Sequence, residues 1–237
     1  MNNSFGNAAR LIGAGLRALL VLTLVTGVIY PLVITGVAQG LFSNKANGSE
    51  IKVDDKVVGS ELIGQTYYLP KKNPDDAEEA SVADLKWFQP RPSNGLGSNS
   101  VNTQYSLLLS GATNRSGDNG AVDGKCPENA EEGTLCAQVL GAKAAVIKDN
   151  STATYKVKPA DVPADAVTSS GSGLDPDISP EYADLQVHRV AEKNNLDVKQ
   201  VEKLVDEHTS GRTLGFIGEP RVNVLELNIA LKQLTEK

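Results

Sequence analysis

Histidine, cysteine, methionine and tryptophan are scarce in this chain of 237 residues, which has two, two, one and one of them. A metal site needs about four ligands, so this scarcity argues against a protein metal centre. Basic residues are also in deficit, because 23 Lys and Arg stand against 29 Asp and Glu and give a formal net charge of -6. A nucleic-acid partner would require a basic stripe, so we expect no nucleic acid among the partners.

Signatures of nucleotide hydrolysis and of serine hydrolases are missing as well. The nearest imitation of a Walker A loop, residues 120–125, has the wrong spacing. No serine lies in a Gly-X-Ser-X-Gly elbow. A triad of a serine with His208 and Asp175 is conceivable, but His208 is expected at a helix C-terminus, where histidine is favourable for dipole reasons alone. We therefore expect no catalytic residue in this chain.

Charge is absent from residues 18 to 44, and most of this stretch is apolar. The run is long enough to cross a bilayer, which needs about 20 apolar residues. A cleaved signal peptide is the alternative, but its apolar region is usually only about 7–15 residues long. We predict a short cytoplasmic N-terminus at 1–17, a transmembrane helix at 18–42 and an exported domain at 45–237, with a loop-rich insertion around 71–136.

The interior of the predicted helix contains residues that a simple tether would not need. Pro31 removes one helix hydrogen bond and should kink the helix. Gly27 and Gly36 leave small surfaces that a neighbouring helix could approach closely. We therefore predict that this helix packs against partner helices as well as lipid, with tolerated helix breakers in lipid as the alternative.

Positive charges flank the helix almost evenly, so they do not decide its orientation. A domain of this length is translocated largely regardless of flanking charge. Cys126 and Cys136 lie close in sequence and favour a disulfide over free thiols, which remain the alternative. A disulfide requires an oxidising compartment. We expect a single-pass protein of the plasma membrane with its N-terminus in the cytoplasm and its C-terminal domain outside.

Both helix and strand signals occur after the apolar run. Residues 51–58 predict a hairpin with Asp54 and Asp55 at its turn, and the aromatic residues 66–69 predict a strand. Helices are predicted over 137–148, over 180–194 behind a serine cap, from Asp197 to a stop at Gly211, and after a cap at Asn223. The expected fold class is α/β, with one transmembrane helix followed by one mixed α/β exported domain.

One glycine-rich loop and a few large side chains are candidate binding residues. The loop is Ser170, Gly171, Ser172 and Gly173, whose small residues would let backbone N–H groups approach a phosphate, although a tight turn is the alternative. Trp87, Phe88 and Arg91 have the composition of an interface anchor, or could cover the domain's own core. Arg221 suits a buried or interfacial ion pair.

Several segments carry residue combinations that match no general catalytic signature. They are residues 26–39 with Tyr30-Pro31, 59–65, 88–93, 170–176, 189–191, 208–212 and 218–225. In this order they resemble the C subunit of the Kdp potassium-transporting ATPase. The chain departs from that family in the middle, where extra residues contain both cysteines and only residues 110–114 resemble the family's serine-glycine segment.

The resemblance implies three protein partners: a channel-like potassium-binding subunit, a P-type ATPase catalytic subunit and a small peptide subunit. This chain has neither the Asp-Lys-Thr-Gly of such ATPases nor a Thr-Val-Gly-Tyr-Gly filter. The resemblance therefore implies a non-catalytic subunit that assembles the pump and tunes its potassium affinity, with no firmly bound cofactor. One alternative is a nucleotide-binding subunit that uses residues 170–173 to raise the pump's affinity for ATP. Another is an independent, anchored ligand-binding domain.

Overall fold

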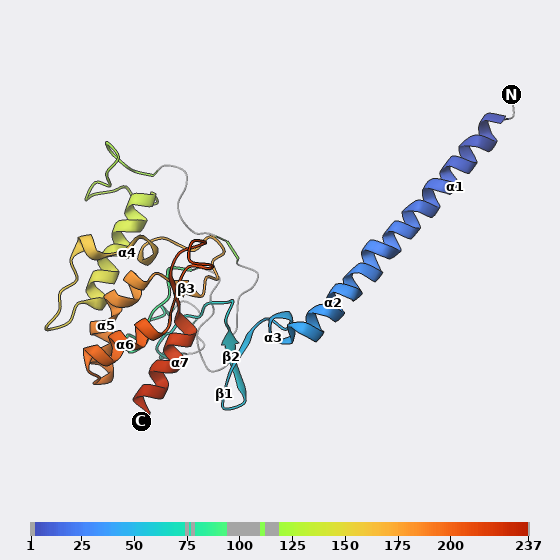
Figure 1. The fold of residues 1–237 in the computed structure, drawn as a ribbon. Helices are drawn as coiled ribbons and strands as arrows, with labels where there is room; N and C mark the ends of the chain where they lie inside the picture. Colours follow the sequence, from blue (N-terminus) through green and yellow to red (C-terminus); the bar gives the residue numbers. More distant parts are fainter. Residues whose placement is uncertain (1–2, 74–75, 77–78, 94–109, 112–118, 237) are drawn as a thin grey trace. The chain divides into compact units, whose positions relative to one another are not determined.

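The structure is a computed structural model that describes residues 3–73, 76, 79–93, 110–111 and 119–236. It divides into two compact units, one ending at Glu50 and the other running from Ile51 to the C-terminus. The first is a long helix and the second is a domain of helices and short strands (Figure 1). Parts of the predicted insertion, 74–75, 77–78, 94–109 and 112–118, lie outside the described residues.

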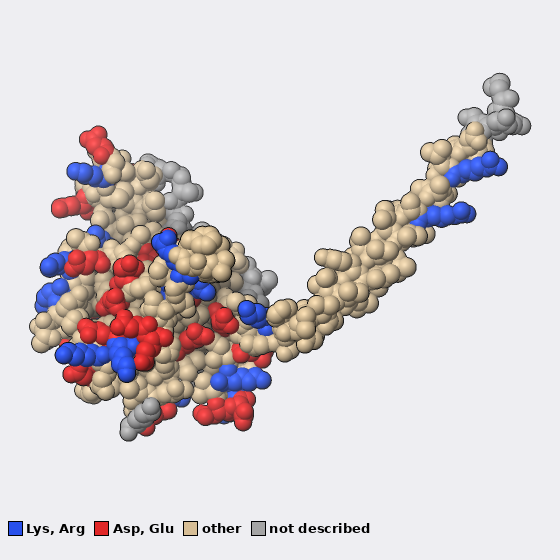
Figure 2. All heavy atoms as spheres, viewed as in Figure 1, with Lys and Arg blue, Asp and Glu red and all other residues tan. Residues whose placement is uncertain are grey.

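The first unit is helical almost throughout. Helix α1 (Asn3–Leu24), the π-helical turn η1 (Val25–Ile29) and α2 (Tyr30–Leu41) follow one another without a break, and a short helix α3 (Ser43–Ala46) comes next. The stretch Gly6–Leu41 is long and apolar enough to cross a membrane. Its charged residues, Arg10 and Arg17, lie near its N-terminal end, and the rest of its visible surface is uncharged (Figure 2). The long N-terminal apolar helix of the predicted fold class is confirmed.

The π-helical turn is how the helix accommodates its proline. Pro31 has no N–H, so it cannot donate the regular helix hydrogen bond to the carbonyl four residues earlier. The N–H of Tyr30 instead reaches the carbonyl of Val25, five residues back. The hydroxyl of Thr26 donates to the carbonyl of Leu22 over 2.7 Å. At the place where the sequence predicts a kink, the structure shows this single wide turn in an otherwise continuous helix.

The second unit begins with the predicted hairpin. Strands β1 (Glu50–Val53) and β2 (Lys56–Ser60) are joined by Asp54 and Asp55, with φ of 50° and 62°. Two positive φ angles in succession define the type I′ turn that matches the twist of a two-residue hairpin. Aspartate tolerates this conformation better than most residues. The hairpin prediction is therefore confirmed.

The aromatic strand predicted at 66–69 is wrong. Tyr68 forms only an isolated bridge with Ala83. The N–H of Leu69 donates to Val82, and the carbonyl of Tyr67 accepts from Asp84, each over 2.8 Å. These residues pair with an irregular segment, so no continuous ladder of strand hydrogen bonds forms.

Four helices follow: α4 (Leu135–Asn150), α5 (Pro180–Asn194), α6 (Val198–Glu207) and α7 (Val224–Thr235). Ser179 caps α5, Asp197 forms a capping box with Gln200 at α6, and Asn223 caps α7, as predicted. The predicted stop of α6 at Gly211 is wrong. The helix ends at Glu207 because the next residues form strand β4 (Thr209–Ser210).

A three-stranded antiparallel sheet lies among these helices. Strand β5 (Arg221–Asn223) is central, between β3 (Asp177–Ile178) and β4. The short 3-10 helices η3 (Pro159–Asp161) and η4 (Ala164–Ala166) precede it in the chain. The buried core is drawn mainly from α5, α6, β5 and α7. The mixed α/β class is thus confirmed, with small antiparallel sheets.

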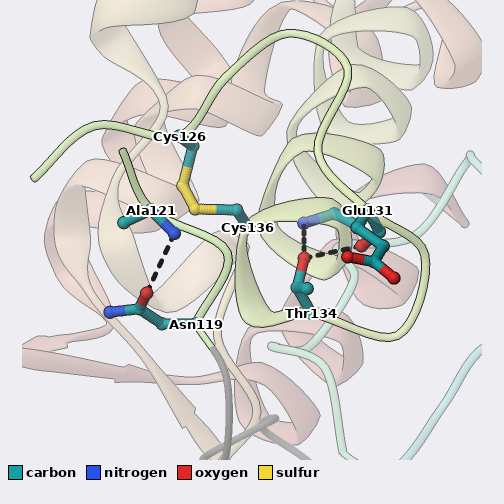
Figure 3. Close-up of a disulfide and its surroundings, with 7 residues drawn as sticks. Asn119, Ala121, Cys126, Glu131, Thr134 and Cys136 are labelled. Carbon is teal, nitrogen blue, oxygen red and sulfur yellow. Dashed lines mark hydrogen bonds between the residues drawn. A yellow bond between two sulfur atoms is a disulfide. The ribbon is translucent and has the colours of Figure 1, made fainter. Parts of the chain in front are cut away.

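The two cysteines form a disulfide at the start of α4 (Figure 3). Their Cα atoms are 5.2 Å apart, and 10 positions separate them in sequence. Cys136 is buried in the first turn of α4, whereas Cys126 is exposed. Thr134 caps the helix by accepting from Ala137 over 3.2 Å. The bond therefore ties residues 119–134 of the insertion to a helix that packs on α5.

Replacing Cys126 with serine should loosen this part of the insertion and leave the core folded. Cys126 is exposed, so the change removes the covalent link without opening a cavity. Closing such a short loop contributes roughly 2–3 kcal/mol in the chain-entropy model. We expect protease to cut C126S between residues 119 and 134 far faster than the parent, while the core stays folded and its free energy of unfolding falls by at most this amount. Parent protein treated with a reductant is the control, and an equally protected C126S would contradict the prediction.

Candidate functional site: the junction of four motif segments

Four motif segments that are distant in sequence meet beside the three-stranded sheet. We call their meeting place the motif junction and define it as residues 59–65, 88–93, 168–177 and 221–224. Two segments pair directly, because Asp177 lies opposite Asn223 in the sheet. The other two are hydrogen-bonded to them. The side-chain amide of Asn223 donates to the carbonyl of Glu61 over 2.9 Å, and the N–H of Ser170 donates to the carbonyl of Pro92 over 3.0 Å.

Gly64 allows the closest contact in the motif junction. Its N–H donates to the carbonyl of Leu174 over 2.9 Å. A Cβ atom at this position would overlap with the carbonyl oxygen of Asp175 and lie 3.0 Å from its carbonyl carbon. That neighbour is backbone, which cannot swing aside. Only a residue without a side chain fits here.

Arg91 fixes the loop at 168–175 to its own segment. One guanidinium nitrogen forms an ion pair with Asp175 over 3.1 Å. The other donates to the carbonyls of Thr168 and Ser169, each over 3.3 Å. The side chain is largely buried, so these bonds act where water competes weakly. Arg91 therefore has a role inside the domain.

The predicted phosphate-binding loop is tied into the domain by its own backbone. Ser170 is fully buried, and its N–H is donated to Pro92. The carbonyl of Ser172 accepts from the N–H of Gly111 over 2.7 Å, and the Ser172 hydroxyl accepts from the N–H of Leu174 over 3.1 Å. Gly173 has a φ of 71°, a conformation that favours glycine. Gly171, two positions earlier, is exposed. The nucleotide contact at this loop stays a prediction.

A buried arginine holds the segment that leads into the motif junction. Arg189, on α5, is 1% exposed. Its guanidinium donates to the carbonyl of Trp87 over 2.9 Å and also to the carbonyl of Leu85. It further donates to the side-chain oxygens of Asn150 over 2.8 Å and Gln186 over 2.5 Å. One side chain thus connects α4, α5 and the irregular segment that contains Leu85 and Trp87.

Two buried side-chain amides, Gln186 and Asn228, hold the same stretch of backbone, and together with Arg189 we call them the buried clamp. Gln186 accepts from the N–H of Gln89 over 2.7 Å and donates to its carbonyl over 3.0 Å. Asn228, on α7, exchanges the same pair of bonds with Phe88, each 2.9 Å long. Residues 85–89 have no neighbouring strand among the described residues, so these side chains satisfy backbone groups that would otherwise be buried without partners.

The Arg189 charge is stabilised mainly by neutral oxygen atoms. Burial lowers the pKa of the guanidinium to about 10, although Tyr182, Asp149 and Asp84 each raise it. The side chain therefore remains charged at neutral pH. Burial also raises the pKa of Tyr182 to about 12, so that phenol stays neutral. The arrangement resembles a solvation shell built from carbonyls and amides, and it needs arginine's several donors in one plane.

Arg221 forms an ion pair with Asp177 over 2.9 Å in the motif junction. Both side chains line a hollow of about 390 Å³. Burial raises the pKa of the Asp177 carboxyl, and this effect outweighs Arg221, which lowers it. The other lining residues are Glu61, Leu62, Pro176, Ser210, Asn223 and Glu226.

The other predicted interface residues lie in different surroundings. Phe88 is fully buried in the core, and Trp87 is half-buried with its ring centroid 5.8 Å from that of Tyr67. On the helix, Tyr30 is exposed and Gly36 has no neighbouring atom where a Cβ would stand. The remaining helix candidates are Gly27 and Pro31. The structure gives Phe88 a core position, and the interface roles of the whole set stay predictions.

The described residues do not assemble a catalytic centre. No group of three or more His, Cys, Asp or Glu side chains in the described ranges could hold a metal ion. Asp175 is engaged by Arg91 and accepts from the N–H of Asp177 over 3.0 Å. His208 lies with Nδ1 2.8 Å from the carbonyl of Leu204. Asp175 and His208, the conceivable hydrolytic pair, thus each contact other groups of the domain.

Sequence reasoning missed the buried clamp. Gln186 and Arg189 stand three positions apart on a helix whose other inward residues are mostly apolar, and Asn228 stands between core leucines of α7. Polar residues at core positions of an amphipathic helix were the available signal, because buried polar groups are nearly always hydrogen-bonded. Their partner, the backbone of 85–89, carries no sequence signal.

The fold and the site together define a class of protein: a chain with a long apolar helix and an α/β domain. The motif segments of this domain bind one another and so hold the domain together. The sequence model of the family KdpC: K+-transporting ATPase, c chain, matches residues 12–233. A potassium-transporting ATPase KdpC subunit of Streptomyces avermitilis is 72% identical over 234 residues, covering 99% of this chain and 98% of the relative.

Two further relatives have the same name. The protein of Streptomyces coelicolor is 67% identical over 99% of this chain and 97% of its own length, and that of Caldanaerobacter subterraneus is 42% identical over 92% of each. The chain therefore belongs to the KdpC family. It is an accessory, non-catalytic subunit of a potassium-transporting ATPase.

Proposed function

We propose that this chain is the membrane-anchored assembly subunit of an ATP-driven, high-affinity potassium uptake pump. It stabilises a complex of a channel-like potassium-binding subunit, a P-type ATPase catalytic subunit and a small peptide subunit, and it tunes the affinity of that complex for potassium. The match over nearly the whole chain to the KdpC family supports the pump assignment. The motif junction supports the non-catalytic, structural role, because Arg91 pairs with Asp175 and Arg221 pairs with Asp177 inside the domain.

The proposed topology places residues 1–17 in the cytoplasm, 18–42 in the plasma membrane and 45–237 outside. Among the described residues one helix is long and apolar enough to cross a membrane, which supports one crossing. The disulfide between Cys126 and Cys136 supports an oxidising environment for the domain. In this topology the loop at 170–173 is on the side away from cytoplasmic ATP. We therefore assign that loop to the domain's own architecture, because its backbone bonds to Pro92 and Gly111 tie it into the domain.

The interface with the partner helices is proposed on the membrane helix. Gly36 and Gly40 are four residues apart and therefore share a face, and neither has a neighbouring atom at its Cβ position. Such a pair permits close approach of another helix. Gly27 and Tyr30 lie around the π-helical turn, nearer the middle of the apolar run.

Reconstitution of the pump with and without the full-length chain tests the proposal. We expect potassium-stimulated ATPase activity to be lost without the chain and regained when it is added. The chain alone should hydrolyse no ATP, because it has no Walker lysine and no phosphorylatable aspartate motif. Partner subunits that stay assembled and fully active without the chain would refute the proposal. Recovery of activity by excess ATP alone would favour the nucleotide-binding role instead.

A further inference from the structure

The loop between β4 and β5 exposes three large apolar side chains at its tip. Leu214, Phe216 and Ile217 are 79%, 71% and 51% exposed, while the rest of the loop from Gly211 to Pro220 is exposed as well. Figure 2 shows an uncharged projection with Lys or Arg atoms beside it at the place where Figure 1 draws this loop. We call residues 213–218 the apolar tip. Its residues take no part in the domain core.

The apolar tip is a closed turn. Thr213 and Ile217 exchange two backbone hydrogen bonds, each 2.9 Å long, and the N–H of Gly215 donates to Arg212 over 3.0 Å. Leu214 and Gly215 have φ of 55° and 81°, which is the type I′ pattern. Arg212 and Glu219 join the two sides of the loop below the tip by an ion pair of 2.5 Å. These bonds satisfy part of the backbone of the tip, which lowers the penalty for moving that part out of water.

The chain itself keeps the domain close to a bilayer. The apolar helix ends at Leu41 and the second unit starts at Ile51. A linker of this length spans at most about 30–36 Å when fully extended. A lipid surface is therefore within reach of the domain whatever else it binds.

We propose that the apolar tip inserts into the surface layer of the bilayer that the N-terminal helix spans. Residues 213–218 contain no charge. Glu219, which anionic lipid would repel, is neutralised by Arg212. Three side chains make a patch far below the ~800 Å² that each partner buries in a standard protein interface, but they suffice for shallow insertion. The inference rests on the anchor role of the proposed function and not on the pump partners.

The test uses the full-length chain with Phe216→Trp in vesicles of phosphatidylcholine and phosphatidylglycerol. Bromine atoms on the lipid acyl chains quench tryptophan by contact. We expect bromines near the top of the acyl chains to quench the introduced indole more than deep ones, as for a residue about 5–10 Å inside the headgroup boundary. The emission should also shift to the blue and lose its quenching by aqueous acrylamide. The signal of Trp87, measured in the parent chain, is subtracted.

The matched control is Val122→Trp, at a position 62% exposed that lies in the disulfide-linked insertion. The indole of V122W should be quenched by acrylamide and not by lipid bromines. Equal bromine quenching in the two variants, or none in F216W, would overturn the insertion. An F216W signal that becomes protected only when the pump partners are added, without bromine quenching, would assign the tip to a protein contact and also overturn it. Flotation of the parent chain with the vesicles checks the anchor separately, and its failure would refute anchor and insertion together.

Discussion

Arg189→Leu should remove about 3–5 kcal/mol from the free energy of unfolding, the largest effect we expect from one substitution. The leucine fills the space but donates no hydrogen bond. The carbonyls of Leu85 and Trp87 and the side-chain oxygens of Asn150 and Gln186 then lose a donor in the buried interior. Each acceptor left without a partner costs about 1–3 kcal/mol, and relief from burying the guanidinium offsets only part of the total.

Denaturant unfolding of the detergent-solubilised chain measures this loss, with Trp87 fluorescence as the probe. Arg212→Leu is the matched control, because it removes the same guanidinium from an exposed position, where its ion pair with Glu219 contributes at most about 1 kcal/mol. A native domain has only about 5–15 kcal/mol in total, so R189L should also reduce assembly of the pump. Equal stability of R189L and R212L would show that the clamp is not what holds residues 85–89.

Gly64→Ala should lower the stability by about 1–3 kcal/mol and weaken copurification with the pump partners. The added methyl group would overlap with the carbonyl oxygen of Asp175, so one of the two segments must move. Movement there breaks the bond from Gly64 to Leu174 and disturbs the loop that Arg91 holds. The loss in assembly therefore follows from separation of the motif segments.

The control for this experiment is Gly171→Ala in the same loop. Gly171 has an ordinary φ and no atom within 4 Å of its Cβ position, so alanine should be tolerated there. Both variants are compared by unfolding midpoint and by recovery of the partners on a tag attached to this chain. If G171A lowers recovery and G64A does not, the exposed face of the loop, and not the packing at Gly64, is the part that matters for assembly.

Local signals predicted the helices of the domain well. The caps at Ser179, Asp197 and Asn223 are formed by side chains only two or three residues from the N–H groups they satisfy, so the sequence contains the whole interaction. The hairpin turn at Asp54 is equally local. Where a distant segment decided the outcome, prediction failed. Residues 66–69 have strand composition but meet an irregular segment, and α6 stops early because β4 pairs with β5.

The candidate site was predictable as a set of segments but not as an arrangement. Nothing in the residues around Gly64 says that the backbone of Asp175, far along the chain, presses against it. The clamp is less visible still, because Arg189 binds carbonyl groups, and every residue has one. Contacts between a side chain and a distant backbone leave no pattern that a single sequence can reveal.

The π-helical turn before Pro31 changes which side chains of the apolar helix lie on one face for a partner helix to contact. One residue inserted into an α-helix rotates everything beyond it by about 100°. Side chains on α1 and α2 that would share a stripe on an ideal α-helix therefore face different directions, and a straight partner helix cannot follow one stripe along the whole length. The two halves of the apolar helix can thus present separate faces, so that a single helix can contact two neighbouring helices that lie on different sides of it.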